Sequence, residues 1–165
     1  VENKIPVLGV IYAPVTMYLY YAAKGIGAYN IANCRLPTCP DKSVIANCKE
    51  LLKKSYILPL SDHTQKFTIV ASRSHFSKET EDFINEMKKI HNEVGIISAG
   101  SSLKFCLVAE GKADVYPRFG PTMEWDTAAG QAIVQCAGKN VIDFETKKPM
   151  LYNRENLRNG WFVVE

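Results

Sequence analysis

The sequence predicts a layered α/β domain, and three observations support that prediction. The chain has 165 residues, which is the length of one domain and enough to bury a core without disulfides or metals. Hydrophobic residues make up 47% of it and charged residues 22%, as is typical of a folded globular protein. After residue 66, β-rich runs alternate with helical segments of about ten residues, a pattern typical of helices packed on a sheet.

The N-terminal segment predicts an antiparallel hairpin followed by a third strand. β-rich runs at residues 6–12 and 17–23 are separated by a short turn. Gly25 and Gly27 mark the next turn, before a third run at residues 28–31. These glycines lack the third glycine and the following helix of a dinucleotide-binding fingerprint, so we expect them to form a turn only.

The segment from about residue 33 to residue 66 has a weak hydrophobic pattern. It contains three prolines and scattered Asp, Lys and Asn residues, which favour loops. We expect an excursion from the core, with a short surface helix at residues 43–54. The excursion belongs to a single domain that spans residues 1–165.

The alternating part begins with a strand at residues 67–71 and a helix capped by Ser77. Acidic residues in the first turn of this helix, and Lys88 and Lys89 at its end, complement the helix dipole. Its buried face is predicted by four apolar residues at helical spacing, Phe83, Ile84, Met87 and Ile90. Further strands are predicted at residues 94–98, 113–116 and 140–143, and further helices at residues 101–110 and 126–137.

Charge and cysteine content limit the partners and the compartment. The 20 basic and 17 acidic residues give a net charge of +3, and their scattered arrangement predicts no nucleic-acid partner but allows a small anionic ligand. The longest apolar runs are too short to span a membrane. The five cysteines have no zinc-binding spacing, so we expect unpaired thiols and a cytoplasmic protein.

Two segments that follow predicted strands carry side chains suited to phosphate. Residues 72–75 combine two serines, an arginine and His75, which bind phosphate oxygens or simply form a loop with a helix-capping serine. Gly100 lets a ligand approach the backbone, and Ser101 at a helix start leaves N–H groups free. Lys104 lies one turn later and can join the same anion site. The alternative is a plain N-cap with a solvated lysine.

Two later segments add a cation and a carboxylate. Arg118 follows the predicted strand at residues 113–116, and its guanidinium either binds phosphate or stacks on the neighbouring aromatic ring. Asp126 lies in the first turn of a predicted helix, where it either caps the helix or binds a hard cation such as Mg²⁺. The small residues behind it, at positions 128–130, allow close packing of another segment or of a ligand. One carboxylate alone does not make a catalytic metal centre.

Five motifs occur together along the chain. They are GVIYAP at residues 9–14, GIGAY at 25–29, SRSH at 72–75, the long block from GSSLK to WDTAAGQAIV at 100–134, and YNRENLRNGWFV at 152–163. Together they closely resemble the C-terminal half of the CysQ-type 3′(2′),5′-bisphosphate nucleotidases, in the inositol monophosphatase superfamily. The resemblance runs from about residue 4 to the end and fades only between about residues 30 and 66.

The resemblance implies the layered α/β/α C-terminal domain of that fold and a Mg²⁺-dependent, lithium-sensitive phosphatase. Such enzymes remove the 3′-phosphate of adenosine 3′,5′-bisphosphate, a by-product of sulfate activation, and leave AMP. Asp126 in WDTAAG is implied as a metal ligand and catalytic residue. The residues implied to bind the nucleotide are His75, Gly100, Ser101, Lys104, Arg118 and Asp126.

The sequence also departs from the family pattern. The other metal ligands of the family, a glutamate and an Asp-Pro-(Leu/Ile)-Asp-Gly-Thr motif, lie in an N-terminal half, and that motif does not occur in this chain. We therefore expect a C-terminal domain that needs the N-terminal half as its partner and is inactive alone. The alternatives are an inositol- or sugar-phosphate phosphatase of the same superfamily and a non-catalytic phosphonucleotide-binding module.

Overall fold

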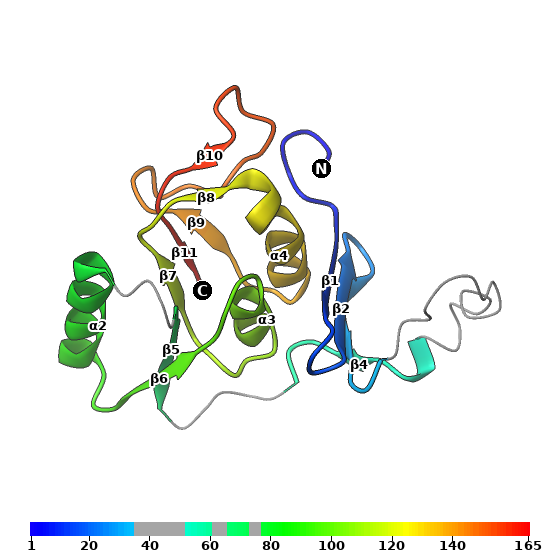
Figure 1. The fold of residues 1–165 in the computed structure, drawn as a ribbon, viewed down its shortest axis with the longest axis horizontal. Coiled ribbons are helices and arrows are strands. Elements are labelled where there is room, and N and C mark those ends of the chain that lie inside the picture. Colours follow the sequence, from blue (N-terminus) through cyan, green and yellow to red (C-terminus); the bar gives the residue numbers. More distant parts are fainter. Residues whose placement is uncertain (35–51, 61–65, 73–76) are drawn as a thin grey trace.

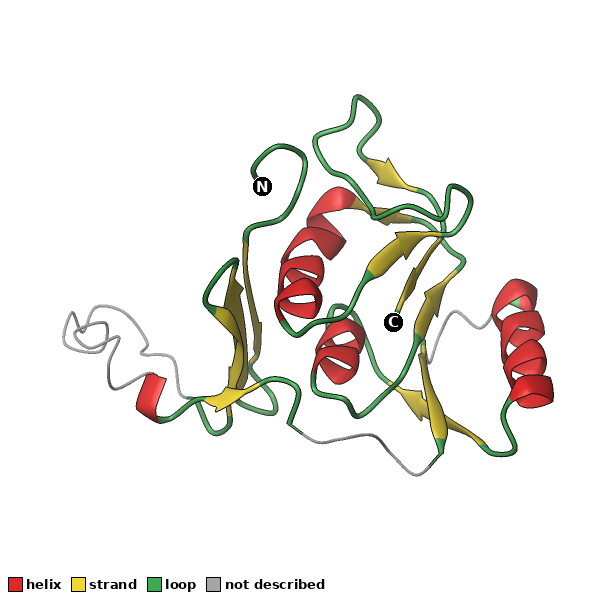
Figure 2. Cartoon of the chain, turned by 180° about the vertical axis from the view of Figure 1, so that it is seen from behind, coloured by secondary structure: helices red, strands yellow, loops and turns green. Residues whose placement is uncertain are grey.

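The computed structural model stacks helices and sheets in layers (Figure 1). Helix α2 (Lys78–Ile90) covers one face of a mixed sheet, and helices α3 (Leu103–Ala109) and α4 (Glu124–Cys136) cover the other. This confirms the predicted α/β class, and an antiparallel sheet on the far side of α4 adds a layer (Figure 2). The structure describes residues 1–34, 52–60, 66–72 and 77–165.

The antiparallel sheet is formed mainly by the N-terminal segment. Its strands, in spatial order, are β1 (Leu8–Ala13), β2 (Tyr18–Ala23), β3 (Gly27–Ile31) and β4 (Tyr56–Ile57). The predicted hairpin and third strand are therefore confirmed, and β4 was not predicted. Gly9 of β1 lies so close to the backbone carbonyl of Ala129 that a side chain at position 9 would collide with it. The sheet can therefore pack closely on α4.

The mixed sheet joins two sets of strands. Strands β5 (Phe67–Ala71) and β6 (Val94–Ser98) are parallel, whereas β11 (Phe162–Val164) pairs antiparallel with β7 (Tyr116–Arg118) and β9 (Val141–Asp143). A parallel bridge between Ile69 and Val115 connects the two sets. Because helices cover both faces, strand β5 is buried continuously rather than at alternate positions.

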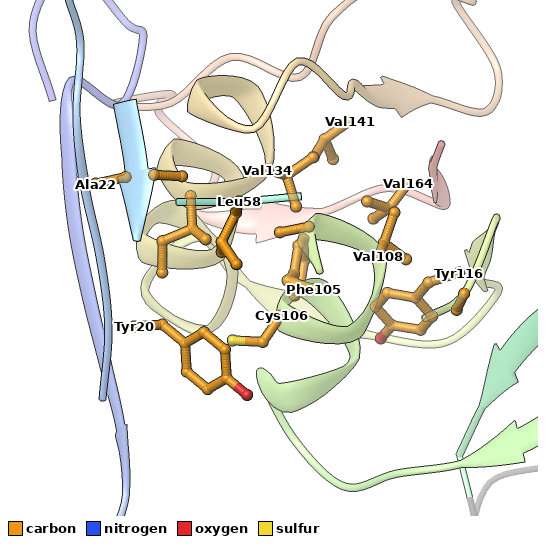
Figure 3. Packing of buried hydrophobic residues seen from close by; sticks show 14 of the residues in the cluster. Tyr20, Ala22, Leu58, Phe105, Cys106, Val108, Tyr116, Val134, Val141 and Val164 are labelled. Carbon is orange, nitrogen blue, oxygen red and sulfur yellow. The ribbon is translucent and has the colours of Figure 1, made fainter. Parts of the chain in front are cut away.

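The main core lies around α3 and α4, between the two sheets (Figure 3). Phe105 of α3 packs edge-on against Tyr116 of the mixed sheet. Gly130 of α4 faces the Phe105 ring, where an added Cβ would come within 2.5 Å of Cγ. The small-residue face of α4 therefore packs against protein segments, β1 and α3, rather than against a ligand.

Several predicted boundaries are wrong by a few residues. Helix α3 begins at Leu103 rather than at residue 101, and the strand predicted at residues 113–116 is shifted to β7. Ile90 was predicted to lie on the buried face of α2 but is 66% exposed. At this end of the helix the next residue, His91, stacks on Phe67 instead.

Other elements either were not predicted or cannot be compared with the prediction. Strand β11 and the short antiparallel pair β8 (Thr122–Met123) and β10 (Arg158–Asn159) were not predicted. The helix predicted at residues 43–54 falls mostly outside the described residues. Within the described ranges, no helix has the length and apolarity to cross a bilayer.

Candidate functional site

A pocket of about 450 Å³ opens between the start of α3, strand β7 and the first turn of α4. Five of the six predicted site residues line it, namely Gly100, Ser101, Lys104, Arg118 and Asp126. The sixth, His75, lies outside the described residues, although Ser72 of the same motif lines the pocket. The structure therefore brings together side chains that are up to 55 residues apart in the sequence, from Ser72 to Thr127.

Lys104 is a buried cation at the base of this pocket. Only 3% of the residue is exposed, which excludes the alternative of a solvated lysine. Its Nζ donates to the carbonyl of Ser101 at 3.0 Å and lies 5.1 Å from the ring centre of Tyr116. Burial and then the charge of Arg118 lower the pKa of Lys104 to about 8. An anion in the pocket would offset both effects.

Arg118 supplies a second cation with unused hydrogen-bonding capacity. Its Nη2 donates to the carbonyl of Pro121 at 3.1 Å, whereas its buried Nε has no hydrogen-bond partner. Two ion pairs between described residues, Lys112 with Glu110 and Arg154 with Glu124, include neither pocket cation. Two neighbouring cations without a carboxylate partner give the pocket side chains that can bind an anion.

The backbone at Ser101 adds to this anion site. Ser101 has a φ of 45°, in the left-handed region, and Ser102 follows in the right-handed helical region with a φ of −68°. Such an alternation turns successive N–H groups toward one side and forms an anion-binding concavity. Ser102 does not cap α3 with its side chain. Its hydroxyl instead donates to the carbonyl of Asp126 at 3.2 Å and so ties the two sides of the pocket together.

Asp126 is the one carboxylate among the described lining residues. Its Oδ2 accepts from the N–H of Met123 at 2.8 Å, so it caps α4 as one of the two interpretations predicted. The side chain is exposed and can still offer an oxygen to a cation. In the part of the chain that the structure describes, no three acidic, His or Cys residues cluster as a metal site. Asp126 therefore fits Mg²⁺ as a single ligand, not as a complete site.

Other lining residues were not among the predicted site residues. Phe105 and Tyr116 form an apolar wall, and Thr122 and Thr127 add hydroxyl groups beside Asp126. Burial raises the pKa of Tyr116 to about 12, so its phenol is neutral at physiological pH. Tyr116 stands two residues before Arg118, and that spacing along one strand would have placed both on the same face.

Comparisons with known proteins agree with the fold. A family model described as "Inositol monophosphatase family" matches residues 1–160. The 3′(2′),5′-bisphosphate nucleotidase CysQ of Salmonella typhimurium is 40% identical over 164 residues, which are 99% of this chain and 56% of that protein. The CysQ protein of Escherichia coli K12 is 38% identical over 165 residues, again 56% of its length.

Solved structures give the same result. The crystal structure of CysQ from Bacteroides thetaiotaomicron, a bacterial member of the inositol monophosphatase family, matches with a TM-score of 0.91 and 51% identity. The match covers 100% of this chain and 59% of that one. The 2′AMP-bound structure of SaIMPase-II matches with a TM-score of 0.65 at 19% identity, which supports the fold alone. The chain thus spans somewhat more than half the length of these relatives.

Proposed function

The chain belongs to the inositol monophosphatase family, and we propose that it is the C-terminal half of a Mg²⁺-dependent 3′(2′),5′-bisphosphate nucleotidase. In this proposal the complete enzyme removes the 3′-phosphate of adenosine 3′,5′-bisphosphate, and the pocket on this chain binds phosphate groups of that nucleotide. The CysQ relatives, at 38% to 51% identity, support this choice of substrate. The odd number of cysteines, with free thiols at the described positions, supports a cytoplasmic location.

One observation carries the proposal: Lys104 and Arg118 face one pocket without a carboxylate partner. Burying a charge is costly unless it is paired, and the depressed pKa of Lys104 reflects that cost. A dianionic phosphate group would supply both partners, including an acceptor for the buried Nε of Arg118. The apolar wall of Phe105 and Tyr116 strengthens these contacts by excluding water.

In the complete enzyme, the residues of this chain would hold the substrate and share the cation. Lys104, Arg118 and the N–H groups at Ser101 would neutralise and orient the phosphate. Asp126 would supply one ligand to Mg²⁺, and the bound ion would polarise the phosphoryl group and activate water. Because Asp126 is one carboxylate, the remaining ligands must come from outside the described residues.

An apolar sheet face supports a missing partner half. On the side of the antiparallel sheet away from α4, Val10 pairs with Tyr21, Tyr21 with Tyr29, and Tyr29 with Ile57. Val10 is 54% exposed and Ile57 is 68% exposed. An apolar face of this kind is typical of an interface. We propose that it packs against the part of the enzyme that the relatives contain and this chain does not.

The ligand is tested by calorimetric titration of the chain with adenosine 3′,5′-bisphosphate, AMP and inositol 1-phosphate. We expect salt-sensitive binding of the bisphosphate that is tighter than that of either monophosphate, because two phosphates engage the cationic pocket. When Lys104 is replaced in the same experiment, Lys88→Ala on the exposed face of α2 is the control for a general loss of positive charge. Equal affinities for the three ligands would contradict the proposed substrate and favour an inositol- or sugar-phosphate phosphatase.

Catalysis by the chain alone is a separate question. With one carboxylate at the pocket, we expect no Mg²⁺-dependent release of phosphate from the bisphosphate. This shortage favours the second candidate, a phosphonucleotide-binding module, for the chain taken by itself. Phosphate release that disappears in Asp126→Asn would show that the chain is catalytic and that the missing-half proposal is wrong.

A further inference from the structure

The segment from Tyr152 to Asn159, which forms most of the YNRENLRNGWFV motif, lies behind the pocket wall. Strand β10 at its end pairs with β8, with Asn159 opposite Thr122 and Arg158 opposite Met123. The N–H of Glu124 donates to the carbonyl of Leu157 at 2.9 Å. The segment therefore contacts the strand and the helical turn that carry Thr122, Asp126 and Thr127 to the pocket.

Asn159 is the centre of these contacts and is 5% exposed. Its Nδ2 lies within hydrogen-bond distance of three oxygens, Thr122 Oγ1 at 3.0 Å, Met123 O at 2.9 Å and Thr127 Oγ1 at 3.1 Å. The N–H of the same Met123 donates to Asp126 Oδ2. One peptide segment thus lies between Asn159 on one side and the pocket carboxylate on the other.

Asn159 is itself fixed from behind. Its Oδ1 accepts from Arg154 Nη2 at 2.8 Å, and Arg154 Nε donates to Glu124 Oε1 at 2.9 Å. Glu124 Oε2 also accepts from the N–H of Asn153 at 2.8 Å. Burial by itself would raise the pKa of Glu124, but these hydrogen bonds hold it below its usual value. The carboxylate is thus charged and anchors the loop to the start of α4.

We propose that Asn159 is a positioning residue, which sets Asp126 and Thr127 at the distance from Lys104 and Arg118 that the ligand requires. Its amide holds β8 and the first turn of α4 together, and Arg154 holds the amide in its orientation. Asn159 itself does not line the pocket. The inference rests on the proposed function, because the distance matters only if the pocket binds a phosphorylated ligand.

The test uses Asn159→Asp in the complete 165-residue chain. This substitution keeps the acceptor for Arg154 and replaces the donor that faces the carbonyl of Met123 by a charged oxygen. Asn156→Asp is the control for added charge, because it adds the same charge at an exposed position of the same segment and keeps the oxygen that accepts from the N–H of Arg158. Asn159→Ala, which adds no charge, replaces Asn159→Asp if the latter does not fold.

Amide hydrogen exchange measures the positioning without any ligand. We expect exchange at Met123 and Glu124 to become about tenfold faster in Asn159→Asp, as befits loss of a buried hydrogen bond. Exchange at Val70, whose N–H donates to Val115 in the mixed sheet, should not change. Unchanged rates at Met123 and Glu124, or equal acceleration at Val70, would overturn the inference, since the role would then be absent or merely structural.

Titration with adenosine 3′,5′-bisphosphate tests the consequence for the pocket. We expect about tenfold weaker binding in Asn159→Asp and unchanged binding in Asn156→Asp. If Lys104→Met weakens binding but Asn159→Asp does not, the ligand site stands and the positioning role is overturned. No binding by the wild type would instead overturn the proposed function, and the exchange rates would still decide whether Asn159 fixes the turn.

Discussion

The first turn of α4 separates two groups of polar side chains that differ in how their hydrogen bonds are satisfied. Behind it, Glu124, Arg154 and Asn159 hydrogen bond to one another and to the backbone around them. In front of it, Lys104 contacts carbonyls and an aromatic ring, and the buried Nε of Arg118 has no acceptor. Behind the turn the Glu124 carboxylate and the Arg154 guanidinium form an ion pair, whereas in front of it Lys104 and Arg118 line the pocket without an ion pair to its one described lining carboxylate, Asp126.

This difference distinguishes polar side chains that stabilise the fold from polar side chains that are available to a ligand. A buried network whose members are satisfied stabilises one arrangement of the chain. Buried cations without counter-charges destabilise the folded chain and are retained where a ligand offsets their cost. Substitutions behind the turn should therefore lower stability, and substitutions in front of it should lower affinity without lowering stability. Each prediction below tests this separation, in order of decreasing expected effect.

The largest effect is expected from Glu124→Ala. This change leaves the Nε of Arg154 and the backbone N–H groups of Asn153 and Arg154 without their acceptor. We expect the free energy of unfolding to fall by about 3 kcal/mol, measured by urea denaturation at pH 7. Glu124→Gln keeps one acceptor oxygen and should lose less. A loss below that of an exposed control, Glu155→Ala, would mean that the network does not stabilise the fold.

Lys104→Met tests the opposite side of the turn. Methionine keeps much of the apolar length that packs on Tyr116 and removes the buried charge. We expect affinity for adenosine 3′,5′-bisphosphate to fall by about 1–3 kcal/mol, with the free energy of unfolding unchanged or raised by about 1 kcal/mol. Calorimetry and urea denaturation of the same samples measure both. A substantial loss of stability would contradict the separation between the two groups.

The pH dependence of binding follows from the pKa of Lys104. In the free chain this pKa is about 8, and a bound anion raises it, so binding favours the protonated amine and is accompanied by proton uptake above pH 8. Affinity should be full below pH 8 and fall about tenfold for each pH unit above it, until the pKa of the bound form is reached. Lys104→Arg, which stays charged, should bind with a flat profile over pH 7–9. If the affinity of Lys104→Arg declines in the same way above pH 8, the pH dependence is due to the titration of another group.

The sequence predicted the pocket side chains in front of the turn far better than the hydrogen-bonded side chains behind it. Ser101 and Lys104 lie close to Gly100, and Arg118 follows a predicted strand, so their chemistry and the family resemblance could be interpreted together as an anion site. Asn159 is an ordinary loop residue in the sequence, and its partner Thr127 is 32 residues away. No local sequence pattern predicts such a contact, because the contact forms only when β10 pairs with β8.

The same limit applies to the fold. Strands at residues 67–71 and 94–98 were predicted with correct ends, and Ser77 caps α2 as expected, accepting from the N–H of Thr80. Strand β11, in contrast, has three residues and owes its existence to pairing with β7 and β9 on both sides. Helix α4 begins two residues before the predicted start because its first N–H bonds to the carbonyl of Leu157, in a distant loop.

The smallest effect is expected from Tyr152→Phe, which tests whether the two groups are independent. The Tyr152 hydroxyl lies 3.1 Å from Thr127 Oγ1 and 3.0 Å from Gln131 Oε1, and burial raises its pKa, so it is a neutral donor. Removing it costs one hydrogen bond inside the satisfied group. We expect about 1 kcal/mol less unfolding free energy and an affinity for adenosine 3′,5′-bisphosphate within about twofold of wild type, because Asn159 still holds Thr127. A larger loss of affinity than of stability would show that the hydroxyl of Thr127 is set by Tyr152 rather than by Asn159.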